Sequence, residues 1–323
     1  MKIINTEHFA IQRKIVACKT SESWQNVPHV CYNYEPEVSA FYDTYKKVFS
    51  SRCVENKITF NTLMLKVITE GLKQAPVMNS HITYNHRFLR GRIDTFETVN
   101  ISVPTILPNG EMMTLNLRDF QNRDLEKMTA YIKDINRRAA QSDLSESMYA
   151  VSFDNTMQNL RKGKIVETVT RLWGAYVGSS KVKHMRGKEK KAYNAISESE
   201  RLTLRDLEPG TITVSNIGST YLQQHGATSL LEIVPPQVCA ISVGAVQDKP
   251  VVTTDSRGRK NITVGKVLPM CIAFDHRALD FGEIVPFLKK LDEIFANPEV
   301  MLGWLPQTQT EGEEKDDRLH VVA

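Results

Sequence analysis

Cysteine is scarce in this sequence, and the cysteines it has are never closely spaced. The chain has five, an odd number, with no C-x-x-C pair among them: Cys18, Cys31, Cys53, Cys239 and Cys271. Disulfide frameworks and structural zinc sites both need cysteines in recurring, paired spacings. The sequence therefore predicts a protein without disulfides and without a metal site.

Long apolar runs and a strong charge bias are also missing. Residues 1–10 contain no apolar core of signal-peptide length, and no run elsewhere approaches the length that spans a membrane. The 41 basic and 37 acidic residues leave a net charge of only +4, which is too small to indicate nucleic acid or membrane binding. We expect a soluble cytoplasmic protein.

The most informative stretch lies near the end of the chain, at residues 271–283. An apolar, strand-forming run ends at Asp275, and His276 and Asp280 follow four positions apart. A helical pattern then begins, because apolar residues recur at three- and four-residue spacing: Ile284, Phe287, Leu288, Leu291, Ile294 and Phe295. His276 is therefore expected where a buried strand meets a helix.

This junction allows two interpretations of His276. An imidazole titrates near neutral pH, so it could act as a general base toward a thiol or hydroxyl. Alternatively, Asp280 and Glu283 have the spacing of a helix N-cap with its capping box, and His276 would be an ordinary polar neighbour. The residues alone leave both interpretations open.

Residues 275–280, which read D-H-R-A-L-D, resemble the D-H-R-x-x-D-G signature of the dihydrolipoyl acyltransferases of 2-oxo acid dehydrogenase complexes. Chloramphenicol acetyltransferases, which share their fold, carry a similar H-x-x-x-D-G motif. The resemblance implies that His276 is the general base and that Asp280 holds the local geometry. Phe281 departs from the pattern, because both families have glycine there and glycine tolerates backbone angles that phenylalanine does not.

Two further segments resemble the same family. Residues 210–218 are similar to its G-T-F-T-I-S-N-L-G strand, and residues 235–244 are similar to its P-P-Q-x-A-I-L-x-V-G strand. The resemblance implies that Ser215 donates a hydrogen bond to the oxyanion of the tetrahedral intermediate, where negative charge develops during acyl transfer. It also implies that Asn216 and Gly218 contribute to binding substrate or coenzyme A.

The beginning of the chain predicts a helix from about Ala10, a loop over residues 21–27 and a strand over residues 28–34. This order is similar to the opening of the acyltransferase catalytic domain, in which an arginine-containing helix precedes a P-H-V strand. The resemblance implies that Arg13 forms a structural ion pair with Asp280, since a buried aspartate needs a partner and arginine keeps its charge. A solvated Arg13 on the helix surface is the alternative.

The length and composition allow a substantial core in one large or two modest domains, because 41% of the 323 residues are hydrophobic. The resemblance covers residues 10–142 and 202–300, in the family's order. We therefore expect one catalytic domain over residues 1–305. The polar, acidic tail at residues 306–323 is expected to be disordered.

An insertion over residues 143–200 separates the two parts of the resemblance. Helical spacing from Ile165 to Trp173 predicts one or two extra helices within it. Its basic run at residues 181–191 is typical of a solvated loop; a patch facing the phosphates of coenzyme A is the alternative.

The resemblance implies an α/β fold of the chloramphenicol acetyltransferase-like kind, a two-layer sandwich of a mixed sheet with packed helices. The implied activity moves an acyl group between a dihydrolipoyl-like thiol carrier and coenzyme A, which is a substrate, without a metal. The chain shows no lipoyl or subunit-binding segment, so the lipoyl group would come from a separate protein. Family members form trimers with the active site between subunits, which implies a homotrimer or larger assembly with Ser215 and His276 on different chains. Transfer to a small-molecule hydroxyl, as in chloramphenicol acetyltransferases, and a non-catalytic structural trimer are the alternatives.

Overall fold

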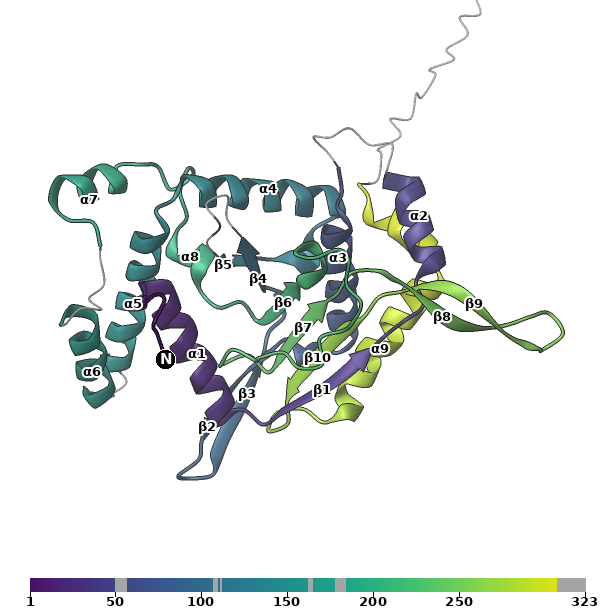
Figure 1. Cartoon of the computed structure of the whole chain (residues 1–323), viewed down its shortest axis with the longest axis horizontal. Helices are drawn as coiled ribbons and strands as arrows, with labels where there is room; N and C mark the ends of the chain where they lie inside the picture. The colour runs from purple at the N-terminus through teal and green to yellow at the C-terminus, as the bar shows by residue number, and fades with distance from the viewer. Residues whose placement is uncertain (50–56, 107–109, 111, 162–164, 178–183, 307–323) are drawn as a thin grey trace, which may run out of the picture.

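A computed structural model describes residues 1–49, 57–106, 110, 112–161, 165–177 and 184–306. Its centre is a six-stranded mixed sheet with the strand order β1-β10-β7-β6-β4-β5 (Figure 1). The strands are β1 His29–Tyr34, β4 Ile101–Ile106, β5 Met112–Leu117, β6 Ile212–Asn216, β7 Cys239–Val243 and β10 Met270–Asp275. Two separate hairpins accompany the sheet, β2 Ser80–Asn85 with β3 Arg90–Thr95, and β8 Gln247–Thr254 with β9 Lys260–Val267.

The strand directions place the end of β10 beside the beginnings of β1 and β7. β10 runs antiparallel to both neighbours, with His29 of β1 opposite Asp275 and Cys239 of β7 opposite Phe274. β7, β6 and β4 are parallel to one another, and β5 returns antiparallel to β4. The turn that carries His276 therefore lies at the end of the sheet where β6 and β7 begin.

Helices surround this sheet, and two of them, α3 and α9, cover one of its faces. The helices are α1 Ile11–Asn26, α2 Ser39–Phe49, α3 Phe60–Gln74, α4 Leu125–Gln141, α5 Leu144–Arg161, α6 Ile165–Tyr176, α7 Gly187–Asn194, α8 Leu204–Leu207 and α9 Phe281–Ala296. The apolar stripe predicted from residue 284 to residue 295 is buried along α9. It packs with α3 and with the apolar residues of the central strands, including Ile272, Ile241 and Val214, in one core. The prediction of a two-layer α/β fold is confirmed.

The opposite face of the sheet carries small and polar side chains. Alternate residues of a strand point to opposite faces, so the neighbours of the core residues Val214 and Ile272 point away from the helices. Ala240 and Ala273 on this second face join a small apolar cluster with Val27 and Ile233. Ser215 lies on the same face, because it is paired with Ser242, two positions after Ala240 in β7.

The first helix is longer than predicted. Residues 21–26, predicted as loop, complete α1, so that part of the prediction was wrong. Serine usually competes with helical backbone hydrogen bonds, but the Ser23 hydroxyl is buried and donates to the carbonyl of Ile233 at 2.7 Å. Lys19 and Glu22 form an ion pair across one turn at 3.0 Å. Tertiary contacts thus keep a polar, loop-like stretch helical.

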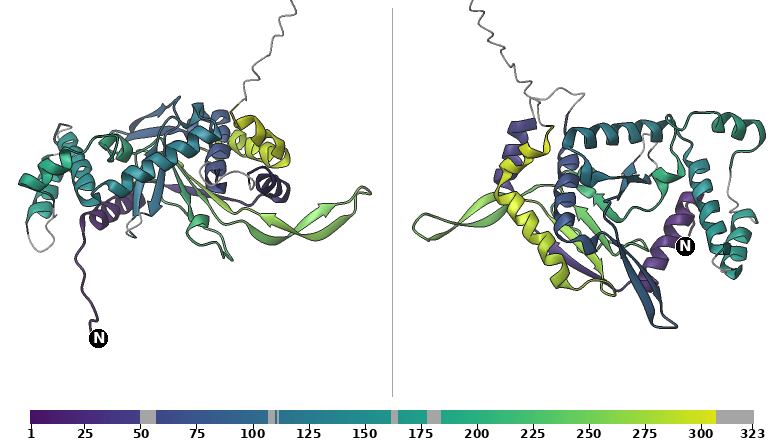
Figure 2. Two further views of the ribbon diagram at one scale, coloured as in Figure 1. Left: turned by 90° about the horizontal axis from the view of Figure 1, so that it is seen from above. Right: turned by 180° about the vertical axis from the view of Figure 1, so that it is seen from behind.

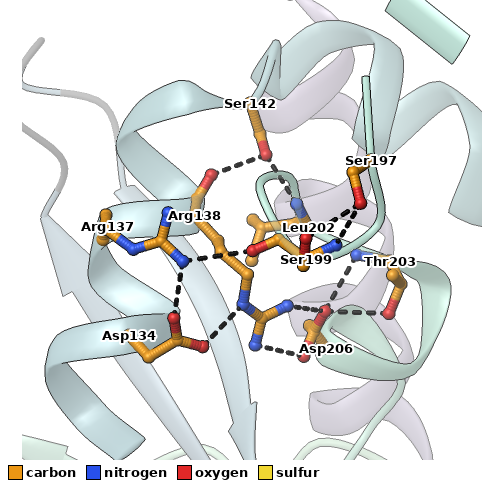
Figure 3. Close-up of polar contacts among 9 residues, drawn as sticks. All are labelled: Asp134, Arg137, Arg138, Ser142, Ser197, Ser199, Leu202, Thr203 and Asp206. Atoms are coloured by element: carbon orange, nitrogen blue, oxygen red, sulfur yellow. Dashed lines mark hydrogen bonds and ion pairs between the residues drawn. The ribbon is translucent and has the colours of Figure 1, made fainter. Parts of the chain in front are cut away.

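The predicted insertion contains α5, α6 and α7, and its return to the sheet is fixed by an ion pair (Figure 3). The guanidinium of Arg138 in α4 donates to both carboxylate oxygens of Asp206 at 2.7 and 3.1 Å. Thr203 donates its amide and its hydroxyl to Asp206 at 2.8 Å each. Ser142 bridges the carbonyl of Arg138 and the amide of Leu202 at 2.8 and 2.7 Å. The chain therefore re-enters the sheet at a set position after these three helices.

Some sequence predictions fall on residues that the structure does not describe. These are Cys53, residues 181–183 of the basic run and residues 307–323 of the tail. Within the described ranges, no helix is long and apolar enough to cross a membrane.

Candidate active site

His276 lies in a turn whose backbone is fixed on both sides. Its amide donates to the carbonyl of Pro28 at 3.0 Å, and the amide of Asp275 donates to the carbonyl of Val238 at 2.9 Å. These two bonds extend the pairing of β10 with β1 and β7 by one step. The imidazole therefore starts from a rigid strand end, as the sequence predicted, while 53% of its side chain is exposed.

The hydrogen bonding of His276 sets which ring nitrogen can accept a proton. Nδ1 lies 3.2 Å from the carbonyl oxygen of Leu279, which can only accept, so Nδ1 carries the proton in this bond. In the neutral ring Nε2 then carries the lone pair. A fixed tautomer of this kind is what a general base requires, since the accepting nitrogen is free of its own proton.

Asp280 lies beside the same nitrogen and begins the following helix. Its Oδ1 is 3.3 Å from Nδ1 of His276, and 81% of its side chain is exposed. It is the N-cap residue of α9, and its amide donates to Glu283 at 2.7 Å, the arrangement of a capping box. A protonated His276 would therefore form an ion pair with Asp280. The Asp280 carboxylate is also stabilised by the positive end of the α9 helix dipole.

An aspartate–arginine pair that the sequence analysis missed holds the turn. Asp275 is fully buried, and the guanidinium of Arg277 reaches it with Nη2 at 2.6 Å and Nε at 3.0 Å from its two oxygens. The amide of Arg277 donates to the same carboxylate at 2.9 Å. The signal was present in the D-x-R spacing, which places an arginine two positions after an aspartate at the end of a buried strand.

The predicted pairing of Arg13 with Asp280 is not found in the described part of the chain. Arg13 is an exposed residue of α1, and the ion-pair partner of Asp280 is His276. Asp280 is itself exposed, so the physical premise of a buried carboxylate applies to Asp275 instead. That carboxylate takes its arginine from two positions along the chain.

Phe281 is the first residue of α9 and its ring turns toward the edge strand. The helix begins at this position with Asp280 as its N-cap, in ordinary helical backbone, so the missing glycine does not prevent the helix from starting. The ring, 46% exposed, packs edge-on against Tyr32 of β1 with ring centroids 5.1 Å apart. The ring therefore lies against β1.

Ser215 and His276 are at opposite ends of the sheet within one chain. Ser215 is paired with Ser242 of β7, which is paired with Cys271 at the start of β10, whereas His276 follows the end of β10. Five residues at about 3.3 Å each and two strand spacings of about 4.8 Å separate them. A single chain therefore does not bring the predicted base and the predicted oxyanion donor together.

Asn216 and Gly218 shape the turn that follows Ser215. The side chain of Asn216 accepts a hydrogen bond from the amide of Ser219 at 3.0 Å, which starts the short helix η4 Ile217–Ser219. Gly218 packs against the backbone of Gly244, and a Cβ at Gly218 would lie 2.4 Å from the Gly244 carbonyl oxygen. Only glycine allows β6 and β7 to approach so closely at their ends.

The two buried cysteines of the sheet, Cys239 and Cys271, do not offer a nucleophile. The four described cysteines form no disulfide. Burial, followed by the neighbouring Cys31, raises the pKa of Cys271 to about 12, and burial also raises the pKa of Cys239. Both thiols therefore stay protonated and unreactive at neutral pH. Among the described residues, no cluster of three histidine, cysteine, aspartate or glutamate side chains could hold a metal ion.

The fold is a mixed sheet covered by helices, with His276 in the turn after the central strand β10. The chain belongs to the 2-oxoacid dehydrogenases acyltransferase (catalytic domain) family, whose model matches residues 3–153 and 186–303. The unmatched residues 154–185 form a shorter segment than the predicted insertion, because the family model matches residues 143–153 and 186–200 at its two ends.

Relatives and solved structures agree with this assignment. The chain is 24% identical over 298 residues to the mitochondrial dihydrolipoyllysine-residue acetyltransferase component of the pyruvate dehydrogenase complex of Schizosaccharomyces pombe, covering 90% of this chain and 46% of the relative. It is 21% identical over 290 residues to the Neurospora crassa protein of the same name, covering 90% and 48%. The chain thus spans about half the length of these relatives. The cubic core of a pyruvate dehydrogenase multienzyme complex has the same fold, with a TM-score of 0.60 at 18% identity over 93% of this chain and 94% of that one.

Proposed function

We propose that this protein transfers an acyl group between coenzyme A and a dihydrolipoyl-like thiol carrier, with His276 as the general base. The observation that carries the proposal is the fixed tautomer of His276, whose Nδ1–H is committed to the Leu279 carbonyl while Nε2 is available to take a proton from the attacking thiol. Family membership supplies the reaction class. The products are the acylated acceptor thiol and the free donor thiol, and the proton on Nε2 returns to the departing thiolate.

The spacing of the candidate residues supports this assignment. A solved dihydrolipoamide acetyltransferase from Azotobacter vinelandii was studied for the roles of a serine, a histidine and an asparagine in its mechanism, and that histidine and asparagine are four positions apart. His276 and Asp280 have the same separation. Asp280 in place of the asparagine adds a negative charge 3.3 Å from Nδ1, which stabilises the imidazolium formed during transfer.

The complete site would form between two copies of the chain. His276 and Ser215 cannot meet within one chain because the strand register holds them at opposite ends of the sheet. In a homotrimer, Ser215 of one subunit would donate its hydroxyl hydrogen to the oxyanion formed beside His276 of the next. The acyl group would then pass directly between the two bound substrates through this oxyanion, so proximity supplies much of the acceleration.

The test is an exchange assay on the purified protein. Acetyl coenzyme A is supplied with free dihydrolipoamide, and formation of the S-acetyl product is followed together with release of coenzyme A. We expect turnover that needs both thiols and disappears in His276→Ala. Transfer only to hydroxyl acceptors, such as chloramphenicol, would show that the acceptor is a small-molecule alcohol and not a thiol carrier. A folded protein that turns over neither acceptor would make it a structural relative of the family.

A further inference from the structure

The hairpin formed by β2 and β3 ends in a basic and apolar tip, here called the arginine tip, residues 85–92. It contains Arg87, Arg90 and Arg92 and no carboxylate. Arg92 pairs with Asp94 at 3.1 Å, whereas Arg87 and Arg90 are exposed and have no ion pair within the described residues. A local excess of this kind contrasts with a chain whose net charge is only +4.

Two large apolar side chains stand exposed at the same tip. Phe88 is 66% exposed and Leu89 is 75% exposed. Leu89 also has a φ of 49°, in the left-handed region that leucine rarely adopts. Within the isolated chain, neither apolar side chain is buried, and the backbone at Leu89 is strained. An exposed pair of apolar residues ringed by arginines is typical of a surface that binds another protein.

The arginine tip is connected to the turn that carries His276. Tyr84, the last residue but one of β2, lies under the guanidinium of Arg277 at 5.6 Å. At the base of the hairpin, the amide of Ile82 donates to the carbonyl of Pro236 at 2.8 Å, in the loop before β7. Figures 1 and 2 show the two strands projecting beyond the sheet from this point. Because an extended strand rises about 3.3 Å per residue, the turn of the hairpin lies within about 10 Å of Tyr84.

We propose that the arginine tip docks the acidic protein domain that presents the acyl-carrying thiol to His276. This inference rests on the proposed function and names the partner for that reaction. Arg87 and Arg90 pair with carboxylates on the carrier domain, and Phe88 and Leu89 pack on its apolar surface between them. The carrier's flexible thiol arm then reaches from the tip to Nε2 of His276.

The charge of the arginine tip predicts how docking responds to salt. Unpaired exposed cations raise the association rate with an anionic partner, and this gain is screened at high ionic strength because the Debye length shrinks to about 3 Å at 1 M salt. A free dihydrolipoamide molecule carries no net charge and gains nothing from the tip. The dependence on ionic strength should therefore separate a carried thiol from a free one.

The test compares the double variant R87E/R90E with the matched control R257E/K260E. Arg257 and Lys260 are exposed near the tip of the β8–β9 hairpin, so both variants change the net charge by the same amount. The acceptors are free dihydrolipoamide and a reduced lipoyl domain with an excess of Asp and Glu. We expect R87E/R90E to lower kcat/KM for the domain at least tenfold at low salt, with free dihydrolipoamide and coenzyme A unaffected, and the control to leave all three unchanged.

Other results would overturn the docking role in distinguishable ways. A raised KM for coenzyme A would assign the arginines to its phosphates, and an equal loss with all acceptors would mean that the tip acts only on the turn of His276. If no thiol is turned over, the proposed function fails, and docking is then tested by titrating the unlipoylated acidic domain into each variant. Binding that is lost in R87E/R90E and restored by a domain with lysines in place of its carboxylates would support the role. Equal binding to both variants, or no binding to the parent, would refute it.

Discussion

Arg277 donates four hydrogen bonds to the fully buried carboxylate of Asp275, three from its guanidinium and one from its amide. This pair fixes the residues on both sides of His276. It leaves the imidazole itself exposed, so the rigidity of the turn and the accessibility of the base have separate origins. Because Asp275 is fully buried and acts through the turn, it is a positioning residue.

Removing Arg277 should lower the stability of the protein as well as its turnover. Arg277→Ala leaves a buried carboxylate without its cation, which costs about 3 kcal/mol in the free energy of unfolding. Urea unfolding measures this loss. Arg277→Lys keeps the positive charge but not the planar guanidinium, so its free energy of unfolding should fall between those of the parent and the alanine variant. Equal stability of the alanine variant and the parent would show that Asp275 is held by its backbone partners alone.

His276→Ala should abolish acyl transfer without unfolding the chain. The side chain is about half exposed, so its removal costs little stability, whereas loss of a general base lowers turnover by about a hundredfold or more. Circular dichroism and urea unfolding check the fold, and the exchange assay checks turnover. Near-normal turnover would remove His276 from the mechanism.

Ser215→Ala tests the oxyanion role and the need for two chains. One lost oxyanion donor lowers turnover by about a hundredfold, while the affinity for coenzyme A should change little. Mixing His276→Ala with Ser215→Ala chains should restore part of the activity, since some interfaces would then carry both intact residues. No recovery in mixed, verified trimers would place the two residues in separate functions.

Much of the fold follows from local patterns in the sequence. The apolar stripe of α9 and the alternation in β6 are local signals, and both elements formed where expected. The position of Ser215 relative to His276 depends on strand order, which no local pattern encodes. The same limit applies to the predicted pair of Arg13 with Asp280: the buried carboxylate of the turn is Asp275, and its arginine is Arg277, two positions along the chain. Residues 21–26 looked like loop because the buried partner of Ser23 lies 210 positions away.

Acid should weaken the link between the insertion and the sheet at Asp206. Burial opposes the charged form of Asp206, but hydrogen bonds from Arg138 and Thr203 outweigh it and lower the pKa below the ordinary value of 3.8. The folded state then binds fewer protons than the unfolded state, so this stabilisation is present above the unfolded pKa and is lost as the pH falls through the folded pKa. Unfolding measured from pH 6 to pH 3 should show this loss, and Asp206→Asn should be less stable at pH 6 and less dependent on pH. Glu208→Gln, an exposed carboxylate two positions away, is the matched control, and a parent-like slope in Asp206→Asn would contradict the assignment.

Phe281→Gly asks whether the glycine of the family motif serves the helix or the substrate. The ring packs against Tyr32 and the residue has ordinary helical backbone, so we expect the parent enzyme to be active as it stands. The glycine variant loses the contact with Tyr32 and gains backbone freedom at the start of α9, which lowers the free energy of unfolding by about 1 kcal/mol. Turnover with coenzyme A should then fall modestly or stay constant. Tyr32→Leu removes the same ring contact without changing the α9 backbone and separates the two contributions. A large gain in activity from a nearly inactive parent would show instead that the phenyl ring blocks the approach of the thiol to His276.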